Sequence, residues 1–409
     1  MKRIILLCLC VLLLNGCSLR KENDRGFLIF RDSEKSATSA SSVSPEKEEK
    51  RCCWLTYLEL NPDRIRSEAQ YRVYLSKLLQ PLTRFKTTDL FVQVRPFADA
   101  IYPSALFEAS AYAAECRGAA LPFDYLSVIL DVSSTLGMRV HAWLNPYRIA
   151  TNPKDALQID PDSPVGVLLR RDNGAHVLEN ASGVWLQPAS AAVQKLILDG
   201  VREILSSYPV AGIHIDDYFY PEQTGGKDAA WYQSYRTAGG MLSLEDWRAE
   251  QINTLLRAIY RTVHAIRDRC VFSVSPGGNP QTDRAACCAD VARWCKEDGF
   301  CDWIIPQLYF GFRNETVPFL QTAKRWQSFC KDGSVQLIAG LALYKAGKPD
   351  PFAGAAGKDE WIRDSAVLAK QLRWIRRLGF NGFALFSAQF VNFQEKVCAK
   401  ACQMLERVI

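Results

Sequence analysis

Residues 208–222 read YPVAGIHIDDYFYPE, an apolar run that ends in two adjacent aspartates followed by aromatic residues. The alternation of its side chains predicts a strand with His214 and Asp216 on one face and Ile213 on the other. Carboxylates directly after a buried strand cost free energy unless a partner or a chemical role offsets the cost, although Asp is also a common turn residue. Carboxylates with perturbed pKa values gather at functional sites, so we interpret Asp216 and Asp217 as candidate catalytic residues in an aromatic-walled cleft.

Similar apolar runs recur along the chain. The predicted strands are Cys53–Leu60, Leu90–Val94, Met138–Leu144, Val210–Asp216, Cys270–Ser275, Trp303–Leu308, Val335–Leu343 and Gly382–Ser387. Between them lie segments of helical period. Ala191–Ser206 and Trp247–Ile266 each carry one apolar stripe, and Ser243 starts a capping-box-like pattern before the second. Continuous apolar strands that alternate with helices favour a parallel sheet covered by helices.

The predicted fold class is α/β, a (β/α)8 TIM-type barrel with enlarged βα loops, because eight such units fit into about 350 residues. A doubly wound open sheet is the alternative. Neither GxGxxG nor GxxxxGK[ST] follows the first predicted strand, which argues against nucleotide-binding versions of that fold. The longest irregular insertion, residues 145–188, follows the third strand, and in a barrel it would form a wall or lid on the catalytic face.

The N-terminus has the pattern of a secretory signal. Lys2 and Arg3 precede an apolar run from Ile4 to Leu14 that is too short to span a bilayer. The following LNGC sequence resembles a bacterial lipoprotein box, in which Cys17 becomes lipidated; a plain secretory signal or an uncleaved anchor are the alternatives. Residues 18–50 are rich in Ser, Lys and Glu and predict a disordered tether. The folded domain is then expected over residues 51–409.

The composition excludes several classes of function. In the 409 residues, 48% hydrophobic and 23% charged content is ordinary for a globular protein, and the net charge is only +6. No dense basic block interleaved with aromatics supports nucleic-acid binding. No pair of CxxC motifs indicates zinc, and we expect neither a metal nor a cofactor.

Polar and aromatic residues follow most of the predicted strands. The strand ends read QVRP, HAWLNPYR, HIDDYFY, SVSPGGN, PQLYF and LYK. In a barrel these ends meet on one face. Amides and Arg provide hydrogen bonds to hydroxyl groups, and aromatic rings pack on the C–H faces of sugars, so the pattern predicts a carbohydrate site.

These segments resemble the glycosyl-hydrolase-like family 10, through RVHAWLNPYR, GIHIDDYFYP, SVSPGGNP, IIPQLYF and GLALYK. The resemblance implies an exported bacterial glycosidase, lipid-anchored in the cell envelope, on the outer membrane facing the periplasm, that acts on cell-wall (peptidoglycan) glycan strands. Carried over by motif, the site residues are Asn145, Arg148, Asp216, Asp217, Tyr218, Tyr220, Gln307 and Tyr309. The chain departs from the family pattern at Arg248-Ala249 and at Gly277-Gly278.

Two mechanisms remain open for Asp216. It is nucleophile or base in the usual two-carboxylate scheme, with Asp99, Asp217 or Glu222 as the acid. In a substrate-assisted scheme, one aspartate of the pair orients an N-acetyl group that attacks C1, and the other protonates the leaving oxygen. The second scheme fits an N-acetylated cell-wall polysaccharide.

Further residues of the predicted strand ends belong to the candidate substrate site. Arg95 and Arg148 are expected to hold Asp216 ionised or to bind a substrate carboxylate, and His214 shares the inward face of Asp216. A non-catalytic glycan-binding lipoprotein is one alternative function, because fold alone does not confer activity. A metal-dependent polysaccharide deacetylase, with His141, His214 and Asp216 as ligands, is another.

Overall fold

The computed structural model describes residues 48–409 except 181–182, 222–223, 225, 332 and 392–395. The predicted signal peptide, Cys17, nearly all of the predicted tether and the candidate acid Glu222 lie outside the described residues. Within them, the chain from Glu48 onward forms one compact unit.

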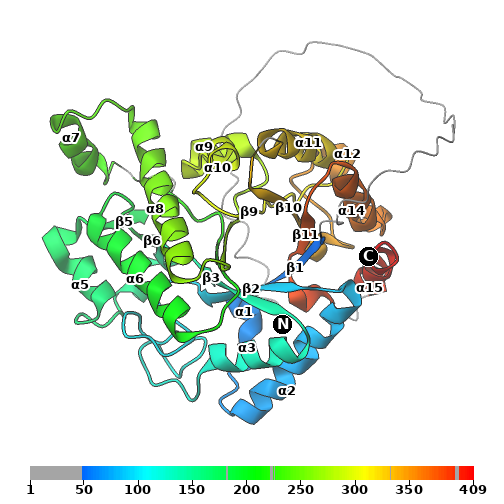
Figure 1. Cartoon of the computed structure of the whole chain (residues 1–409), viewed down its shortest axis with the longest axis horizontal. Coiled ribbons are helices and arrows are strands. Elements are labelled where there is room, and N and C mark those ends of the chain that lie inside the picture. The colour runs from blue at the N-terminus through cyan, green and yellow to red at the C-terminus, as the bar shows by residue number, and fades with distance from the viewer. Residues whose placement is uncertain (1–47, 181–182, 222–223, 225, 332, 392–395) are drawn as a thin grey trace. The chain divides into compact units, whose positions relative to one another are not determined.

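Eight parallel strands close into a barrel in the order β1-β11-β10-β9-β8-β7-β3-β2, which confirms the predicted (β/α)8 fold (Figure 1). The strands are β1 (Lys50–Leu55), β2 (Asp89–Arg95), β3 (Arg139–Leu144), β7 (Gly212–Ile215), β8 (Val271–Val274), β9 (Trp303–Ile304), β10 (Gln336–Leu341) and β11 (Gly382–Leu385). β1 begins earlier than predicted, and the end of that predicted strand is instead the short helix α1 (Tyr57–Leu60).

A helix follows each barrel strand before the next one begins. These helices are α2 (Glu68–Leu79), α3 (Tyr125–Thr135), α6 (Ala191–Ser207), α8 (Leu244–Ile266), α10 (Val291–Lys296), α11 (Phe319–Cys330), α14 (Val367–Arg377) and α15 (Lys396–Glu406). Figure 1 shows them as a ring around the strands. The predicted cap of α8 is present, because Oγ of Ser243 accepts a hydrogen bond from the backbone N–H of Asp246 at 3.1 Å.

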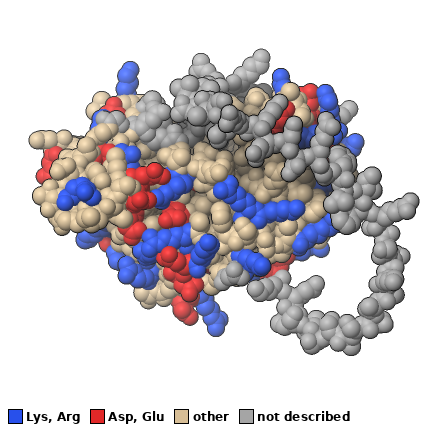
Figure 2. Space-filling model, turned by 90° about the horizontal axis from the view of Figure 1, so that it is seen from above, with Lys and Arg blue, Asp and Glu red and all other residues tan. Residues whose placement is uncertain are grey.

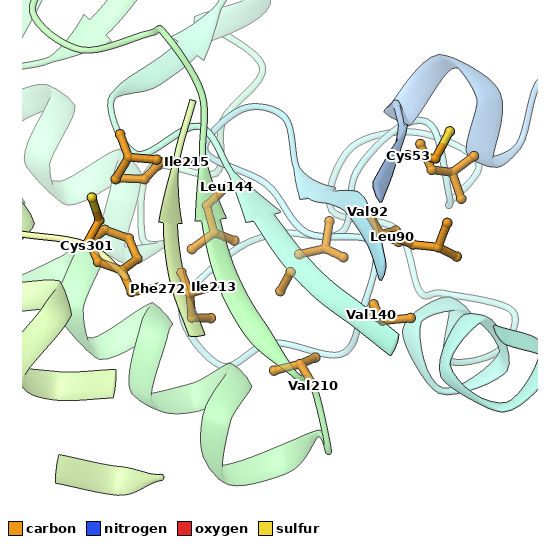
Figure 3. Close-up of a cluster of buried hydrophobic side chains, with 14 of the residues drawn as sticks. Cys53, Leu90, Val92, Val140, Leu144, Val210, Ile213, Ile215, Phe272 and Cys301 are labelled. Atoms are coloured by element: carbon orange, nitrogen blue, oxygen red, sulfur yellow. The ribbon is translucent and has the colours of Figure 1, made fainter. Parts of the chain in front are cut away.

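Alternate side chains of each barrel strand fill two separate cores. The barrel interior holds a cluster that includes Trp54, Phe91 and Trp143. The opposite faces, with Ile213 and Ile215 of β7, pack against the surrounding helices in the main core (Figure 3). This arrangement explains why the strands read as continuous apolar runs, since both of their faces are buried.

The long insertion after β3 contains a second, three-stranded sheet of order β4-β6-β5. Its strands β4 (Arg148–Ala150), β5 (Val177–Asn180) and β6 (Gly183–Leu186) are antiparallel. The helices α4 (Pro153–Ala156) and α5 (Pro164–Arg170) lie between β4 and β5 in sequence. The sequence predicted a wall or lid here and no strands. Because β4 begins four residues after β3 ends, the sheet starts at the mouth of the barrel.

The remaining loops carry short helices. They are α7 (Ala229–Thr237), α9 (Pro280–Cys287), α12 (Gly354–Gly357) and α13 (Glu360–Arg363), with 3-10 turns η1 (Gln80–Phe85), η2 (Arg171–Gly174), η3 (Leu343–Lys345) and η4 (Ala388–Val391). No helix in the described part of the chain is long and apolar enough to cross a membrane. Figure 2 shows basic and acidic side chains interspersed on the face that it presents.

Candidate active site

Asp216 and Asp217 lie at the carboxyl end of β7, where the parallel strands meet at the mouth of the barrel. Asp216 is 5% exposed, whereas Asp217 is only partly buried. Just before them, Gly212 allows the strand to pass the ring of His141, because a Cβ at this position would lie 2.2 Å from the imidazole Nδ1. The barrel therefore brings a buried and a partly exposed carboxyl group together at its mouth.

A relay of side-chain amides holds Asp216. The Nδ2 group of Asn145, directly after β3, donates a hydrogen bond to Oδ1 of Asp216 at 2.5 Å. Oδ1 of Asn145 accepts from Nε2 of Gln93 at 2.6 Å, and Oε1 of Gln93 accepts from the backbone N–H of Tyr57 at 3.2 Å. Because a backbone N–H only donates, both amides in this relay have a defined orientation. The relay directs an N–H group at Asp216.

The two aspartates titrate as a coupled pair. Burial raises the pKa of Asp216 well above its usual range, and the negative charge of Asp217 raises it further, against the hydrogen bond from Asn145 and the charge of Arg148. Burial also raises the pKa of Asp217, against its own backbone N–H, the side chain of Gln307 and Arg148. Since Asp216 is the more buried group, it holds the proton when Asp217 is ionised.

Arg148, the first residue of β4, supplies a buried positive charge. Its guanidinium carbon lies 4.5 Å from the ring centroid of Tyr218 and 5.0 Å from that of Phe97. Its Nε has no hydrogen-bond partner among the residues that the structure describes. The guanidinium therefore sits between aromatic rings and close enough to lower the pKa of both aspartates.

The loop after β9 contributes Gln307 and Tyr309. Gln307 forms an isolated parallel bridge with Gly277, which continues the pairing of β8 and β9 beyond the ends of these strands. The side chain of Gln307 is hydrogen-bonded to Asp217. The ring of Tyr309 packs edge-on against Tyr344, with 5.8 Å between the centroids, and remains partly exposed. Gln307 thus places an amide group next to the carboxyl pair, and Tyr309 follows it two residues later in the same loop.

Arg95 does not point into the barrel mouth, which differs from our expectation. The pairing of β2 with β3 changes register between Gln93 and Arg95, so Arg95 turns toward the helices. There its guanidinium carbon lies 3.8 Å from the ring centroid of Phe107, and it would clash with a Cβ at Gly200 of α6. The side chain is 1% exposed. It packs between the barrel and α6, away from the aspartates.

Two other predicted substrate-binding residues are buried in interior contacts. Nε2 of His214 accepts a hydrogen bond from the indole N–H of Trp54 at 3.0 Å, so Nδ1 carries the proton and donates to Oγ of Ser273 at 2.8 Å. The hydroxyl of Tyr220 donates to Oδ2 of Asp228 at 2.9 Å. Both side chains are at most 2% exposed. These contacts use the polar atoms that a substrate would need.

Asp99, a candidate acid, is buried in another cluster. Burial raises its pKa, whereas the charge of Arg117 and a hydrogen bond from Ser110 lower it. Arg117 in turn pairs with Glu108 at 2.8 Å. Asp99 therefore belongs to the loop after β2, in which its charged neighbours are arginines and not Asp216.

The histidines considered as metal ligands lie in the barrel interior. Nε2 of His141 contacts Oδ1 of Asp89 at 3.0 Å, near the amino-terminal end of the barrel. Both ring nitrogens of His214 are engaged by Trp54 and Ser273. Across the described ranges of the chain, no group of three or more His, Cys, Asp or Glu side chains is arranged to hold a metal ion.

Two residues of this region were absent from the predicted site. Gln93 was visible in the quoted QVRP strand end, but only the relay shows that it supports Asn145. Asp283 lies on α9, nine residues after β8, and no motif marked it. Its proximity to the site comes from the fold: the charge of Asp217 raises the pKa of Asp283.

The sequence over residues 49–355 matches the model of the family described as glycosyl hydrolase-like 10. The chain belongs to the glycosyl hydrolase-like 10 family. It is 31% identical over 330 residues to glycosyl hydrolase DigH of Escherichia coli strain K12, which covers 75% of this chain and 73% of that protein. It is 29% identical over 287 residues to glycosyl hydrolase YngK of Bacillus subtilis strain 168, covering 66% of this chain and 55% of that protein.

Solved structures show the same fold. The glycoside hydrolase domain of PgaB (BpsB) from Bordetella bronchiseptica superposes with a TM-score of 0.56 at 15% identity, over 88% of this chain and 98% of that domain. An alpha-L-fucosidase from Paenibacillus thiaminolyticus superposes with a TM-score of 0.54 at 12% identity, over 88% of this chain and 49% of that protein. This glycosyl hydrolase-like 10 chain therefore shares its barrel with glycoside hydrolases.

Proposed function

We propose that this protein is a glycoside hydrolase that cleaves a glycosidic bond in N-acetylated cell-wall glycan, with Asp216 and Asp217 as its catalytic residues. The observation that carries the proposal is the carboxyl pair at the mouth of the barrel. One member is buried and receives a directed N–H from Asn145, and the other is partly exposed beside Gln307. Membership of the glycosyl hydrolase-like 10 family supports this reaction class.

In the proposed reaction the two aspartates have different roles. Asp216, the protonated member, donates its proton to the glycosidic oxygen as the C1–O bond breaks. Asp217, as carboxylate, accepts a hydrogen bond from the acetamido N–H, and the acetamido oxygen attacks C1 to form an oxazoline. Water then attacks C1 and gives a proton to the carboxylate of Asp216, while the bond between C1 and the acetamido oxygen breaks and the acetamido group is restored. We favour this substrate-assisted route because the two adjacent aspartates supply the proton donor and the group that orients the acetamido group. The acetamido oxygen is the nucleophile, so no enzyme carboxylate has to attack C1.

The surroundings of the pair suit a neutral sugar. The ring of Tyr218 is partly exposed and lies 5.9 Å from that of Trp185, between centroids. Tyr309 adds a second partly exposed ring. Aromatic faces bind the C–H faces of sugar rings, and the guanidinium of Arg148 packs against the ring of Tyr218.

We also propose that the protein acts in the bacterial envelope, anchored through a lipid on Cys17. The support is the basic N-terminus, the short apolar run and the LNGC sequence. A tether of Ser-, Lys- and Glu-rich sequence would then separate the barrel from the membrane. Mass spectrometry of the mature N-terminus tests this proposal, since an unmodified Cys17 in the membrane fraction would contradict it.

Full-length protein in detergent, incubated with intact and with peptide-stripped cell-wall glycans, tests the reaction. We expect glycosidic fragments from the wild type and from Asp268→Asn, which alters an exposed carboxylate before β8, at the other end of the barrel. Asp216→Asn and Asp217→Asn should release none. Glycan binding without any cleavage by the wild type would support a binding protein instead, and loss of acetyl groups from intact chains would support a deacetylase.

A further inference from the structure

Asp283 is a buried acid close to the carboxyl pair that the proposed reaction does not use. It lies in the first turn of α9, which Asn279 caps by accepting the backbone N–H of Gln281 at 3.2 Å. The residue is 7% exposed, and its Oδ2 has no hydrogen-bond partner in the part of the chain that is described. A buried carboxyl oxygen without a partner is costly and calls for an explanation.

The backbone directs this carboxyl group toward the barrel mouth. A Cβ at Gly277 would lie 2.2 Å from Oδ1 of Asp283, so only glycine leaves room for the carboxyl group at the end of β8. Gly277 forms a bridge with Gln307, whose side chain is hydrogen-bonded to Asp217. The carbonyl oxygen of Asp283 accepts the backbone N–H of Ala289 at 3.1 Å, which holds this turn in place. Asp283 therefore lies at the barrel mouth, close enough to Asp217 for the charge of that residue to raise its pKa.

No cation neutralises Asp283 within the described structure. Arg284, the next residue, forms ion pairs with Asp246 and Glu245 of α8 and with Asp290. Arg248 of α8 is bound to Asp228.

The charged group after β7 that acts on Asp283 is Asp217. Burial raises the pKa of Asp283 well above its usual range, and the charge of Asp217 raises it further, against a backbone hydrogen bond from Gly277. A carboxyl group in this position gains stability by keeping its proton.

We propose that Asp283 is a third carboxyl group of the site, a positioning residue that remains a neutral acid and leaves Asp217 as the carrier of the negative charge. This inference rests on the proposed function for its purpose, because the acetamido group requires one carboxylate and not two adjoining ones. As a neutral acid, Asp283 does not repel the charge of Asp217. The coupling is reciprocal: removal of the charge of Asp217 lets Asp283 ionise at lower pH.

Infrared spectroscopy of the full-length protein in detergent tests the proposal without relying on activity. At neutral pH the C=O band of protonated carboxyl groups should be weaker in Asp283→Asn than in the wild type, because the contribution of Asp283 is lost while that of Asp216 remains. The contribution of Asp283 is the difference between spectra recorded with and without the Asp283→Asn substitution. As the pH rises, this difference band should disappear with a midpoint about one pH unit or more lower in the Asp217→Asn background than in the wild type. Asp268→Asn should leave the midpoint unchanged. Asp283→Ser replaces Asp283→Asn if the amide variant does not fold.

An undiminished band in both Asp283 variants, or an unchanged midpoint of the Asp283 difference band in Asp217→Asn, would overturn the inference. Glycan cleavage measured on the same preparations separates this result from the proposed function. If the wild type cleaves glycan while the infrared prediction fails, only the role of Asp283 is lost. If no glycan is cleaved, the proposed function fails, and the infrared band still decides whether Asp283 is the neutral carboxyl group coupled to Asp217.

Discussion

The side-chain amide of Asn145 donates a hydrogen bond to Oδ1 of Asp216, although 71 residues separate the two in sequence. The contact joins the ends of β3 and β7, which are neighbours in the barrel. Because the hydrogen bond favours the charged form of Asp216, it lowers a pKa that burial raises. Asn145 thereby tunes the group that we propose as the proton donor.

Substitution Asn145→Ala should raise the pKa of Asp216 and move the alkaline limb of kcat/KM to higher pH. We expect kcat/KM near neutral pH to fall about 10- to 100-fold, because a hydrogen bond to a charged group contributes about 1.5–3 kcal/mol. Gln70→Ala, at an exposed position of α2, is the control. The pH dependence of glycan cleavage is the measurement. An alkaline limb at the wild-type pH would contradict the assignment of Asp216 as the acid.

Arg148 should control the acidic limb of the same profile. Its charge lowers the pKa of Asp217, so Arg148→Met should raise that pKa, and Asp217 would then lose its charge at higher pH. We expect the acidic limb of kcat/KM to shift upward by about one pH unit. Arg269→Met, an exposed arginine before β8, is the matched control. A shift of the acidic limb to lower pH in Arg148→Met would refute this role.

His214 should make the fold sensitive to acid. Burial lowers its pKa well below the usual range, so the unfolded chain binds a proton that the native protein excludes. The contribution to stability is present above about pH 6.5 and is lost below it, by up to about 1.4 kcal/mol per pH unit. Urea unfolding of the wild type and of His214→Gln measures this loss, which should be smaller in the variant. The control variant His264→Gln, on α8, should lose as much unfolding free energy on acidification as the wild type.

Arg248 should stabilise the loop after β7 and not act on substrate. Its Nε and Nη2 bind the two carboxylate oxygens of Asp228 at 2.6 and 2.9 Å, and Asp228 also accepts from Tyr220. Arg248→Met leaves the carboxylate of Asp228 buried without its cation, so we expect a loss of about 3 kcal/mol in unfolding free energy. Arg248→Met combined with Asp228→Asn should recover part of it. If the single variant unfolds like the wild type but cannot cleave glycan, Arg248 has a role in the reaction.

Local sequence pattern was sufficient to predict the barrel strands. The apolar run of β7 and its neighbours predicted the barrel, because strands buried on both faces must be apolar throughout. The position of Asp216 and Asp217 followed from the end of that run. The prediction for Arg95 was wrong. Strand alternation would place Arg95 on the same face of β2 as Gln93, but the change in register between these two residues turns Arg95 to the opposite face.

The sequence by itself determined the eight strand–helix units, the carboxyl pair at the end of β7 and the family. These features depend on residues close together in the chain. Only the tertiary structure decided that Gln93 and Asn145 form a relay to Asp216, and that Asp283 lies within reach of the charge of Asp217. Such contacts join residues from different strands and loops, and closure of the barrel sets their distances. The burial that raises the pKa values of these carboxyl groups likewise exists only once the barrel is closed.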